Sequence, residues 1–414
     1  MRYAIRQSPG RFRISGAAIA ALTLALPLLA ACNVDAPPAS TGGSRGETCE
    51  RFAVVRSDYQ STLVSLVNAA GEVTSANVVS SGTRIPGATA ALSGDVVLPH
   101  DPPASGKLVL IDRYPNGIVT WLDPESGEVD GQLNVVPGFA SNPHDYLEVA
   151  PNKAYVTRFE TNRAPGHVPF DEGGDILVID PAQRSLSKRI DLSTLGGTVD
   201  PRPDRMTLGN GRAYVTLARL DATFERAEDG LVVAIDVDSD RVVDILPIPG
   251  LKNCANLALS PDARSLAVTC SGLFKVPGPA QIATSGVVVL DLESKTERVR
   301  ATASTLGGAL ASSIGFATND TLVVVVFGSP GDELTSIDVT TGRATKLHGT
   351  RESFTLGEIA CGCGDRCLVP TAEETSLLAA DATSASPLGR LEGSTLPARS
   401  VGAIGPTKPQ ASAP

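Results

Sequence analysis

The stretch Leu122-Asp123-Pro124-Glu125-Ser126-Gly127 ends an apolar run with an aspartate and then turns through a short bend that contains glycine. The same pattern recurs along the chain, at Ile179-Asp180-Pro181, Ile235-Asp236-Val237-Asp238, Leu290-Asp291-Leu292-Glu293, Ile337-Asp338-Val339-Thr340-Thr341-Gly342 and Ala380-Asp381-Ala382-Thr383, with an Asn variant at Val67-Asn68-Ala69-Ala70-Gly71. From Asn68 to Asp381 the successive anchors are 55, 57, 56, 55, 47 and 43 residues apart. Seven anchors at a period of about 50 residues indicate a repeat architecture.

Each period contains four strand-like runs. In the third period these runs cover residues 145–149, 154–157, 176–179 and 188–192. Alternating apolar residues, β-branched residues and Gly, Asn or Pro turns favour antiparallel meanders over helices. Four-stranded units repeated around an axis are the blades of a β-propeller. The second period is the least defined, because residues 89–103 can be aligned in more than one way.

The two ends of the repeat region complement each other. Residues 52–55 match a second strand that has no inner strand before it, and residues 397–404 read as an inner strand without partners. We therefore expect residues 49–405 to form an all-β, seven-bladed β-propeller of four-stranded antiparallel blades, closed by the C-terminal strand joining the N-terminal blade. Such closure removes a free sheet edge.

Some repeat segments resemble a known family. Tyr155-Val156-Thr157 and Tyr214-Val215-Thr216, with Ser260-Pro261-Asp262 before Leu266-Ala267-Val268-Thr269, resemble the YVTN repeat of lactonase-like propellers. The resemblance covers most of residues 50–404 and implies the propeller fold. It says little about activity, because that superfamily contains enzymes as well as binding proteins.

The N-terminus has the features of an export signal. Arg2, Arg6, Arg11 and Arg13 precede an almost wholly apolar run at 14–29, which is shorter than the ~20 residues of a membrane-spanning helix. The run closes on Leu29-Ala30-Ala31-Cys32, which resembles the lipobox of bacterial lipoproteins. We expect a signal peptide at 1–31 and a lipidated Cys32 that anchors the protein to a membrane. The alternative is an ordinary A-x-A cleavage site beside an incidental cysteine.

The residues after Cys32 predict a location and narrow the choice of partners. Asn33, by resemblance to the sorting rule of Gram-negative lipoproteins, favours the outer membrane. Residues 32–48 are rich in Pro, Ala, Ser, Thr and Gly, which predicts a flexible tether, and residues 406–414 are expected to be a disordered tail. Removing the four signal-peptide arginines leaves 31 basic against 45 acidic residues, a net charge of −14. That charge argues against nucleic acid and anionic lipid as partners.

Six cysteines remain once Cys32 is set aside, an even number in an oxidising compartment. Cys254 and Cys270 flank one predicted hairpin, and Cys361 and Cys367 flank another, so each pair is expected to form a disulfide. The third predicted disulfide joins Cys49 to Cys363, with exchange of partners inside the last cluster left open. The alternative, a metal bound by Cys361, Cys363 and Cys367, lacks a well-placed fourth ligand, and no metal or other cofactor is expected.

The sequence carries no G-x-S-x-G, H-E-x-x-H or P-loop motif. The long insertions fall between second and third strands, at 160–174, 220–230 and 271–286, and these loops should share one face with the starts of the inner strands. We expect a polar ring on that face, at the mouth of the central channel, as the candidate ligand site. Its predicted members are His100, Arg113, His144, Asp145, Arg158, Arg202 and Arg205, with Arg219 and His167 nearby. The competing interpretation is that these residues satisfy strand ends and pair with nearby acids.

Two functions fit these observations. The first is a non-enzymatic envelope lipoprotein whose propeller is a scaffold for a protein or a small polar ligand. The second is a lactonase-like hydrolase, or another propeller enzyme, with a His, acid and Arg cluster in the channel mouth. The absence of catalytic motifs favours the first function.

Overall fold

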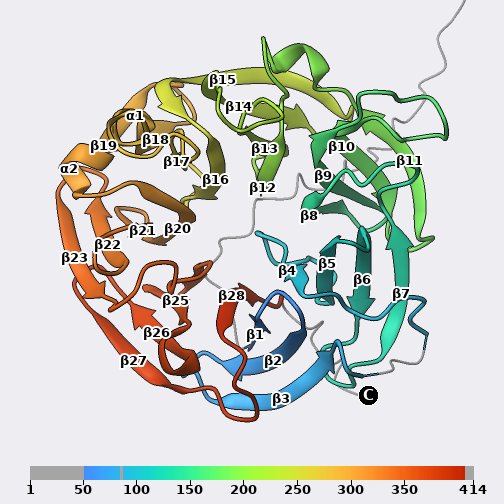
Figure 1. The fold of residues 1–414 in the computed structure, drawn as a ribbon, viewed down its shortest axis with the longest axis horizontal. Helices are drawn as coiled ribbons and strands as arrows, with labels where there is room; N and C mark the ends of the chain where they lie inside the picture. Colours follow the sequence, from blue (N-terminus) through green and yellow to red (C-terminus); the bar gives the residue numbers. More distant parts are fainter. Residues whose placement is uncertain (1–50, 84–86, 406–414) are drawn as a thin grey trace, which may run out of the picture. The chain divides into compact units, whose positions relative to one another are not determined.

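The computed structural model describes residues 51–83 and 87–405, which form seven four-stranded antiparallel sheets arranged in a ring (Figure 1). This confirms the predicted all-β, seven-bladed β-propeller. The predicted signal peptide, the tether and the C-terminal tail lie outside the described residues. Within the described ranges, no helix is both long enough and apolar enough to span a membrane.

The blades follow the chain in order, and the strands of each blade are named from the innermost to the outermost. Blade 1 consists of β28 (Ala398–Ala403), β1 (Arg51–Ser57), β2 (Thr62–Asn68) and β3 (Val73–Ser80). Blades 2 to 4 consist of β4 (Asp95–Val97), β5 (Leu108–Tyr114), β6 (Ile118–Leu122) and β7 (Val129–Asn134); β8 (Pro143–Ala150), β9 (Lys153–Thr161), β10 (Gly173–Asp180) and β11 (Ser185–Ile190); and β12 (Pro203–Gly209), β13 (Arg212–Leu217), β14 (Asp229–Asp236) and β15 (Arg241–Lys252).

Blades 5 to 7 repeat this arrangement. They consist of β16 (Cys254–Leu259), β17 (Ser265–Ser271), β18 (Ser285–Asp291) and β19 (Glu297–Thr302); β20 (Leu310–Thr318), β21 (Thr321–Val326), β22 (Glu333–Asp338) and β23 (Ala344–Gly349); and β24 (Ala360–Cys363), β25 (Arg366–Thr371), β26 (Ser376–Ala380) and β27 (Ala385–Arg390). Short helices lie in the connections, namely η1 (Ser193–Leu195), α1 (Pro279–Thr284), α2 (Ala303–Leu306) and η2 (Glu373–Thr375).

The hydrophobic core is divided among the contacts between blades. Seven of the buried clusters each combine residues of two neighbouring blades, so that every blade-to-blade contact in the ring has one. Strand β1 shows how alternation produces this arrangement. Ala53 and Val55 pack in the cluster shared with blade 2, whereas Phe52 and Val54 pack in the cluster shared with blade 7. Because side chains alternate across a strand, each sheet buries both faces only when it has neighbours on both sides.

The ring closes in blade 1 as the sequence predicted. Strand β28 pairs antiparallel with β1, placing Phe52 opposite Ala403 and Val55 opposite Ser400. Arg56, whose side chain is fully buried, donates to the backbone carbonyls of the connection that leads into β28, namely those of Leu391 (3.2 Å), Glu392 (2.8 Å), Ser394 (2.6 Å) and Leu396 (3.5 Å). One arginine therefore fixes the connection between the last blade and the closing strand.

The strand directions give the ring two different faces. We call one the loop face: it carries the connections between second and third strands and those from each outer strand to the next inner strand. The other, the turn face, carries the remaining connections, including the Asp-containing bends. Arg51 begins β1 and Ala403 ends β28 on the turn face. The longest connections between second and third strands follow β9, β13 and β17, as predicted, and lie on the loop face.

Candidate functional site

Arg205 is the central residue of the channel mouth. It lies in β12, and its guanidinium donates to the carbonyls of His144 (2.8 Å) and Leu98 (3.4 Å) and to the carboxylate of Glu358, just before β24. Burial opposes the charge of Arg205, but the carboxylates of Glu358, Asp145 and Asp204 outweigh it and raise the pKa of the guanidinium. Arg205 thus ties blade 4 to blades 2, 3 and 7.

Asp145 is fully buried beside Arg205. Its carboxylate accepts backbone N–H groups of His100 (2.9 Å), Tyr146 (2.9 Å) and Met206 (2.7 Å) and lies 3.8 Å from the Arg205 guanidinium. Burial raises the pKa of Asp145 to about 7, although Arg205 and the three N–H donors act in the opposite direction. The carboxyl group therefore joins the inner strands of blades 3 and 4 to the segment that follows β4.

His144 and Arg202 belong to a column of stacked side chains on the loop face. The His144 ring stacks on Phe159 with a centroid distance of 4.2 Å, and its Nδ1 lies 2.9 Å from the carboxylate of Asp204. The Arg202 guanidinium lies 4.8 Å from the Phe159 ring and 4.3 Å from the Phe224 ring. Cation–π contacts of this kind favour a charged group that has lost its water.

Hydrogen bonds complete the surroundings of Arg202. It donates to Glu160 (2.7 Å) and to the carbonyls of Leu220 (3.0 Å) and Asp221 (3.2 Å). Only 1% of its side chain is exposed. Arg202 therefore connects the end of β9 to the loop between β13 and β14.

Other predicted members of the polar ring hold their own blades together. Arg158 forms a two-pronged ion pair with Asp175, with both N–O distances at 2.7 Å and both side chains buried. Arg113 donates to Asp95 at 3.0 Å, and Arg219 donates to the carbonyl of Asp229. These arginines therefore satisfy strand ends within their own blades, which is the alternative to ligand binding that the sequence left open.

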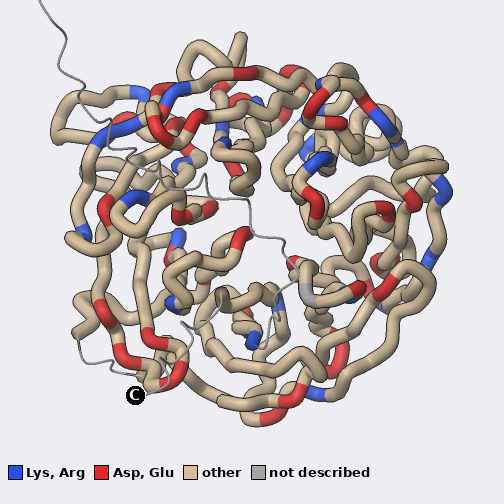
Figure 2. Tube along the Cα trace, turned by 180° about the vertical axis from the view of Figure 1, so that it is seen from behind, with Lys and Arg blue, Asp and Glu red and all other residues tan. Residues whose placement is uncertain are grey.

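The two remaining histidines of the prediction, His167 and His100, lie in different places. His167 is exposed in the loop after β9, where its backbone N–H donates to Asp171 at 2.9 Å. His100 lies three residues beyond the end of β4 and contacts Asp145 through its backbone. The structure thus brings together His100, His144, Asp145 and Arg205, and it separates them from Arg113 and Arg158. Figure 2 shows charged positions both at the inner ends of the blades and along the outer rim.

Sequence reasoning did not single out Glu358, Asp204 and Phe159. Glu358 stands two residues before β24, and Asp204 is the second residue of β12. Both are polar residues at the start of an inner strand, and His144 was predicted from a position of the same kind. Phe159 follows Arg158 near the end of β9, and only the fold shows that it faces His144.

The loop face also carries most of the exposed apolar surface. Among the described residues eight large apolar side chains are exposed, and six of them lie on loop-face connections or at their edges: Tyr59, Tyr114, Val168, Phe274, Val276 and Phe354. The other two, Val243 and Ile245, lie on the outer strand β15. Tyr59, Tyr114 and Phe354 are the most exposed, at 66%, 68% and 70%.

Several loop-face aromatic residues are held in an uncommon backbone conformation. Tyr59, Phe170, Phe224 and Phe354 have φ values of 67°, 67°, 62° and 63°. A bulky residue in this left-handed region costs roughly 1–3 kcal/mol, so the surrounding structure has to enforce it. At Phe354 a buried carboxylate does so, because Asp332 accepts the N–H groups of Phe354 (3.0 Å), Thr355 (2.8 Å) and Leu356 (3.1 Å). Three hydrogen bonds to one carboxylate therefore fix the backbone of this loop.

The turn face carries a cleft of 610 Å³ between blades 6, 7 and 1. Phe52 and Leu368 supply apolar lining, and Asp365, Arg366 and Asp381 supply polar groups. Gly364, next to Cys363, lines the same cleft. The cleft therefore lies beside the place where the described chain begins.

Two of the three predicted disulfides are confirmed. Cys254 bonds to Cys270, its opposite residue across β16 and β17, and Cys361 bonds to Cys367 across β24 and β25. The second bond is incompatible with a metal held by Cys361 and Cys367 as thiolates. Cys32, Cys49 and the side chain of Cys363 lie outside what the structure describes.

Comparisons with known proteins show the fold alone. No known protein-family profile matches the sequence, and no curated protein sequence matches it. Among solved structures, the chain is similar to a protein of Bacteroides fragilis NCTC 9343 that carries a provisional 6-phosphogluconolactonase assignment, with 10% identity, a TM-score of 0.53 and coverage of 81% of this chain and 93% of that one. It is also similar to KlAtg21, solved with the coiled coil of AgAtg16, with 12% identity, a TM-score of 0.52 and coverage of 83% and 95%.

A third similar structure is hydrazine synthase of Kuenenia stuttgartiensis, with 14% identity, a TM-score of 0.50 and coverage of 72% of this chain and 80% of that chain. These proteins differ in what they do, so their likeness carries no activity over to this chain. What they have in common with it is the architecture. In fold, this chain is a seven-bladed β-propeller.

Proposed function

We propose that this protein is an envelope lipoprotein, anchored through Cys32, whose loop face is a binding platform for another protein. One observation carries the proposal: six of the eight exposed large apolar side chains of the described residues lie on the loop face. An excess of exposed apolar side chains on one face favours that face as an interaction surface. Tyrosine and phenylalanine are also the residue types that interfaces favour.

The described chain enters and leaves the ring on the side opposite the loop face. Arg51 begins β1 and Ala403 ends β28 on the turn face, so neither of these two strand ends occupies the loop face. The two disulfides indicate a protein of an oxidising compartment, which agrees with export.

The channel mouth supports a scaffold more than an enzyme. The charges of Arg205, Asp145 and Glu358 are directed at one another and at backbone groups of several blades. Arg158 and Arg202 are buried and paired in the same manner. Charged groups committed to holding the ring together are poorly placed to bind and transform a substrate.

The platform can be tested with a photo-crosslinking amino acid in the full chain, in cells that make the protein. The crosslinker replaces Tyr59, Tyr114 or Phe354 in three variants, and Ile245 on the outer rim in the matched control. We expect discrete crosslinks to another protein from loop-face positions and none from position 245. Crosslinks from position 245 alone, or from no position, would refute the platform.

The anchor needs a separate test. Wild-type protein should carry fatty-acyl groups on Cys32, seen as a mass increase of the N-terminal peptide and as retention in the membrane fraction. Cys32→Ser should lose both. An unmodified Cys32 in membrane-free wild-type protein would rule out the lipid anchor.

A hydrolase at the channel mouth is the second candidate, and one observation favours it. His144 retains 14% side-chain exposure while its Nδ1 lies 2.9 Å from Asp204, an arrangement that orients an imidazole for proton transfer. The candidate predicts lactone hydrolysis that His144→Gln abolishes and Arg163→Gln, a change of an exposed loop residue, leaves intact. An absence of lactonase activity in the wild-type protein would rule out the hydrolase candidate.

A further inference from the structure

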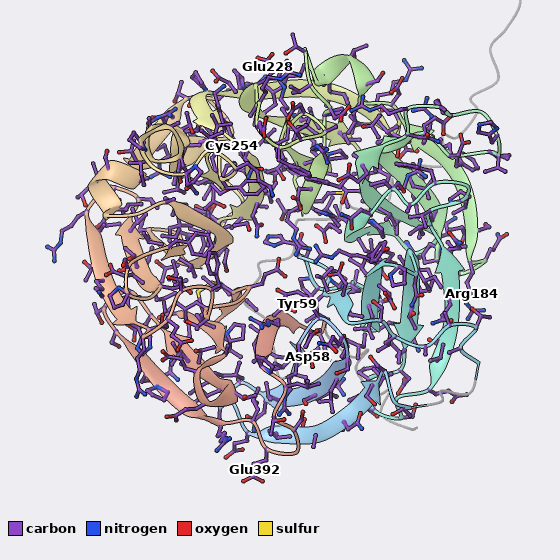
Figure 3. All side chains as sticks on the ribbon, in the orientation of Figure 1. Asp58, Tyr59, Arg184, Glu228, Cys254 and Glu392 are labelled. Atoms are coloured by element: carbon purple, nitrogen blue, oxygen red, sulfur yellow. A yellow bond between two sulfur atoms is a disulfide. The ribbon has the colours of Figure 1, made fainter. Side chains whose placement is uncertain are left out.

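The cleft of 610 Å³ on the turn face lies where the last blade meets the first, and we call it the closure cleft. Blade 7 contributes Asp365, Arg366 and Leu368 to its lining, and blade 1 contributes Phe52. Figure 3 labels Glu392 at the outer rim of this sector of the ring. The volume falls within the range of about 300–1,000 Å³ that small-molecule sites have. The closure cleft is therefore large enough for a small organic ligand.

The other six contacts between neighbouring blades are each bridged by a polar contact near the turn face. The bridges join Arg51 to Glu125, Ser105 to Glu148, Lys153 to Asp240, Asn210 to Ala263, Asp262 to Asn319 and Ser336 to Ala382. In blades 7 and 1, the described connections at 364–366, 381–384 and 69–72 are joined by no hydrogen bond or ion pair. These blades touch at Gly71, where a Cβ would be 2.6 Å from the Cβ of Leu388. The closure cleft takes the place of a bridge.

Arg366 and Asp365 line this cleft without a partner of their own. In the part of the chain that the structure describes, neither side chain forms a hydrogen bond or an ion pair. Cys367 pairs with Ala380 across β25 and β26, so Arg366 and Asp381 are the next residues along these two strands. The lining therefore presents one guanidinium and two carboxylates close together, and the guanidinium is not paired with either.

Asp381 keeps its negative charge although its carboxylate is part of a turn. Its Oδ1 accepts the N–H groups of Thr383 and Ser384, both at 2.8 Å, and these bonds hold the pKa of Asp381 below its usual range. Its Oδ2 accepts the Ser384 hydroxyl at 3.2 Å. A carboxylate oxygen has two lone pairs, so Oδ2 has room for a second donor.

Apolar side chains form the floor between these charges. Phe52 and Leu368 line the closure cleft and are otherwise packed in the core, with exposed fractions of 1% and 4%. Ala69 and Ala382 add two methyl groups to the lining. An occupant of the cleft thus meets a positive group, negative groups and a rigid apolar surface together.

We propose that the closure cleft binds a short peptide with free ends and an apolar side chain. The carboxylate of the peptide pairs with Arg366, whose guanidinium can hold both oxygens, and its ammonium group pairs with Asp365 and Asp381. The apolar side chain packs on Phe52 and Leu368. A ligand with a single charge would leave either the guanidinium or the carboxylates without a partner. The proposal does not depend on the loop-face platform.

The test measures binding of tripeptides to the purified, oxidised mature chain by isothermal titration calorimetry. The probes are free-ended Ala-Xaa-Ala peptides in which Xaa is Leu, Val, Met or Phe. Each has two matched counterparts, one acetylated at its N-terminus and one amidated at its C-terminus. We expect a free-ended peptide to bind about tenfold more tightly than either counterpart, because a blocked end loses a charge-assisted hydrogen bond. No binding of any free-ended peptide, or equal binding of the blocked ones, would overturn the proposal.

Variants assign each end of the peptide to its partner. Arg366→Gln should weaken binding of the free-ended peptide about tenfold and leave the amidated one unchanged, so the preference for a free carboxylate disappears. Asp365→Asn should instead reduce the preference for a free ammonium group. The matched control is Arg264→Gln in a second turn-face cleft, of 430 Å³, which should keep both preferences. A carboxylate preference that persists in Arg366→Gln, or disappears in Arg264→Gln, would contradict the assignment.

Two other occupants of the closure cleft would also overturn the proposal. A dimer of the chain that Arg366→Gln dissociates would identify a second copy as the occupant. Tighter binding of the diamine putrescine than of any tripeptide would identify a polyamine instead. None of these measurements involves Tyr59, Tyr114 or Phe354, so their failure leaves the loop-face platform untouched, and failure of the crosslinking test leaves the closure cleft untouched.

Discussion

Single arginines hold the ends of the second strands in blades 1 to 4. Arg56 binds the connection to β28, Arg113 binds Asp95, Arg158 binds Asp175, and Arg219 binds the carbonyl of Asp229. The same residue type near the end of each second strand finds a different partner in each blade. These buried contacts hold the strand ends beneath the loop face. A site predicted from residue types alone therefore includes arginines whose role is structural.

The buried pair of Arg158 and Asp175 gives the clearest consequence for stability. Replacing Arg158 with Ala removes both short hydrogen bonds to the buried carboxylate of Asp175 and leaves it only the 3.7 Å contact with Arg189, so we expect a loss of about 3 kcal/mol in the free energy of unfolding. Chemical denaturation followed by circular dichroism measures it. Arg163→Ala is the control, because Arg163 is mostly exposed and its pair with Asp200 contributes about 1 kcal/mol or less. Similar losses in both variants would contradict this interpretation of the buried pair.

Asp145 predicts a dependence of stability on pH. Its folded pKa of about 7 exceeds the ordinary value, so between about pH 4 and 7 the folded chain holds a proton that the unfolded chain has released. This group therefore makes folding less favourable as pH rises through that window. Asp145→Asn does not titrate and leaves one N–H donor without an acceptor oxygen, so it should be less stable overall.

The stability gap between wild type and Asp145→Asn should accordingly narrow as pH rises from about 5 to 8. The change should amount to a few kcal/mol at most, because one pKa unit corresponds to about 1.4 kcal/mol. Urea titrations of both proteins at several pH values measure the gap. A gap that stays constant or widens would show that Asp145 remains ionised across the whole range.

At the scale of elements, the repeated Asp bend predicted the blade count and the strand order. The aspartate recurs because the bend between third and fourth strands needs a side chain that accepts the backbone N–H groups of its own turn. Asp338, for example, accepts the N–H groups of Thr340 and Thr341, both at 2.8 Å. The weak second period corresponds to β4, an inner strand of only three residues, Asp95–Val97. So short a strand leaves little periodic pattern to read.

The sequence predicted where on the fold the candidate site residues lie, but not which residues they contact. The positions of His144 and Arg205 at inner-strand starts follow from the repeat. The crossing of the channel from Arg205 to Glu358 joins residues 153 positions apart, and only the ring brings them together. The outward position of Tyr59 and Phe354 likewise depends on left-handed loops that have no clear sequence signal.

Strand β28 closes the ring, because it is the inner strand of blade 1 and pairs with β1. Ending the chain after Gly389 removes β28 and the carbonyls that hold Arg56, and it exposes the edge of β1. A buried arginine without acceptors and an open apolar edge favour aggregation. We expect an insoluble product or one without cooperative thermal unfolding. Ending after Gly405 instead should preserve the wild-type melting temperature, and a soluble Gly389 product with that same temperature would contradict the closure role.

At the scale of the whole molecule, the two faces of the ring carry different features. Strand β1 begins and strand β28 ends on the turn face, while most of the exposed large apolar side chains of the described residues lie on the loop face. A ring suits this division, because loops from separate blades can change without disturbing the interfaces between blades. The seven inter-blade clusters supply the stability that the loop-face conformations require.

The cleft on the turn face bears on the third predicted disulfide, which joins Cys49 to Cys363. Phe52, three residues after Cys49, and Gly364, next to Cys363, line the same 610 Å³ cleft. Three residues span at most about 11 Å, so the length of chain between Phe52 and Cys49 allows Cys49 to reach this cleft. We expect a disulfide between Cys49 and Cys363, which mass mapping of the non-reduced protein would show as one linked peptide. Because this bond would join blade 1 to blade 7, Cys49→Ser should lower the melting temperature, and Cys363→Ser should do so equally. Unequal effects, or free thiols at both positions in the wild type, would mean that the ring is held by β28 and Arg56 without a covalent lock.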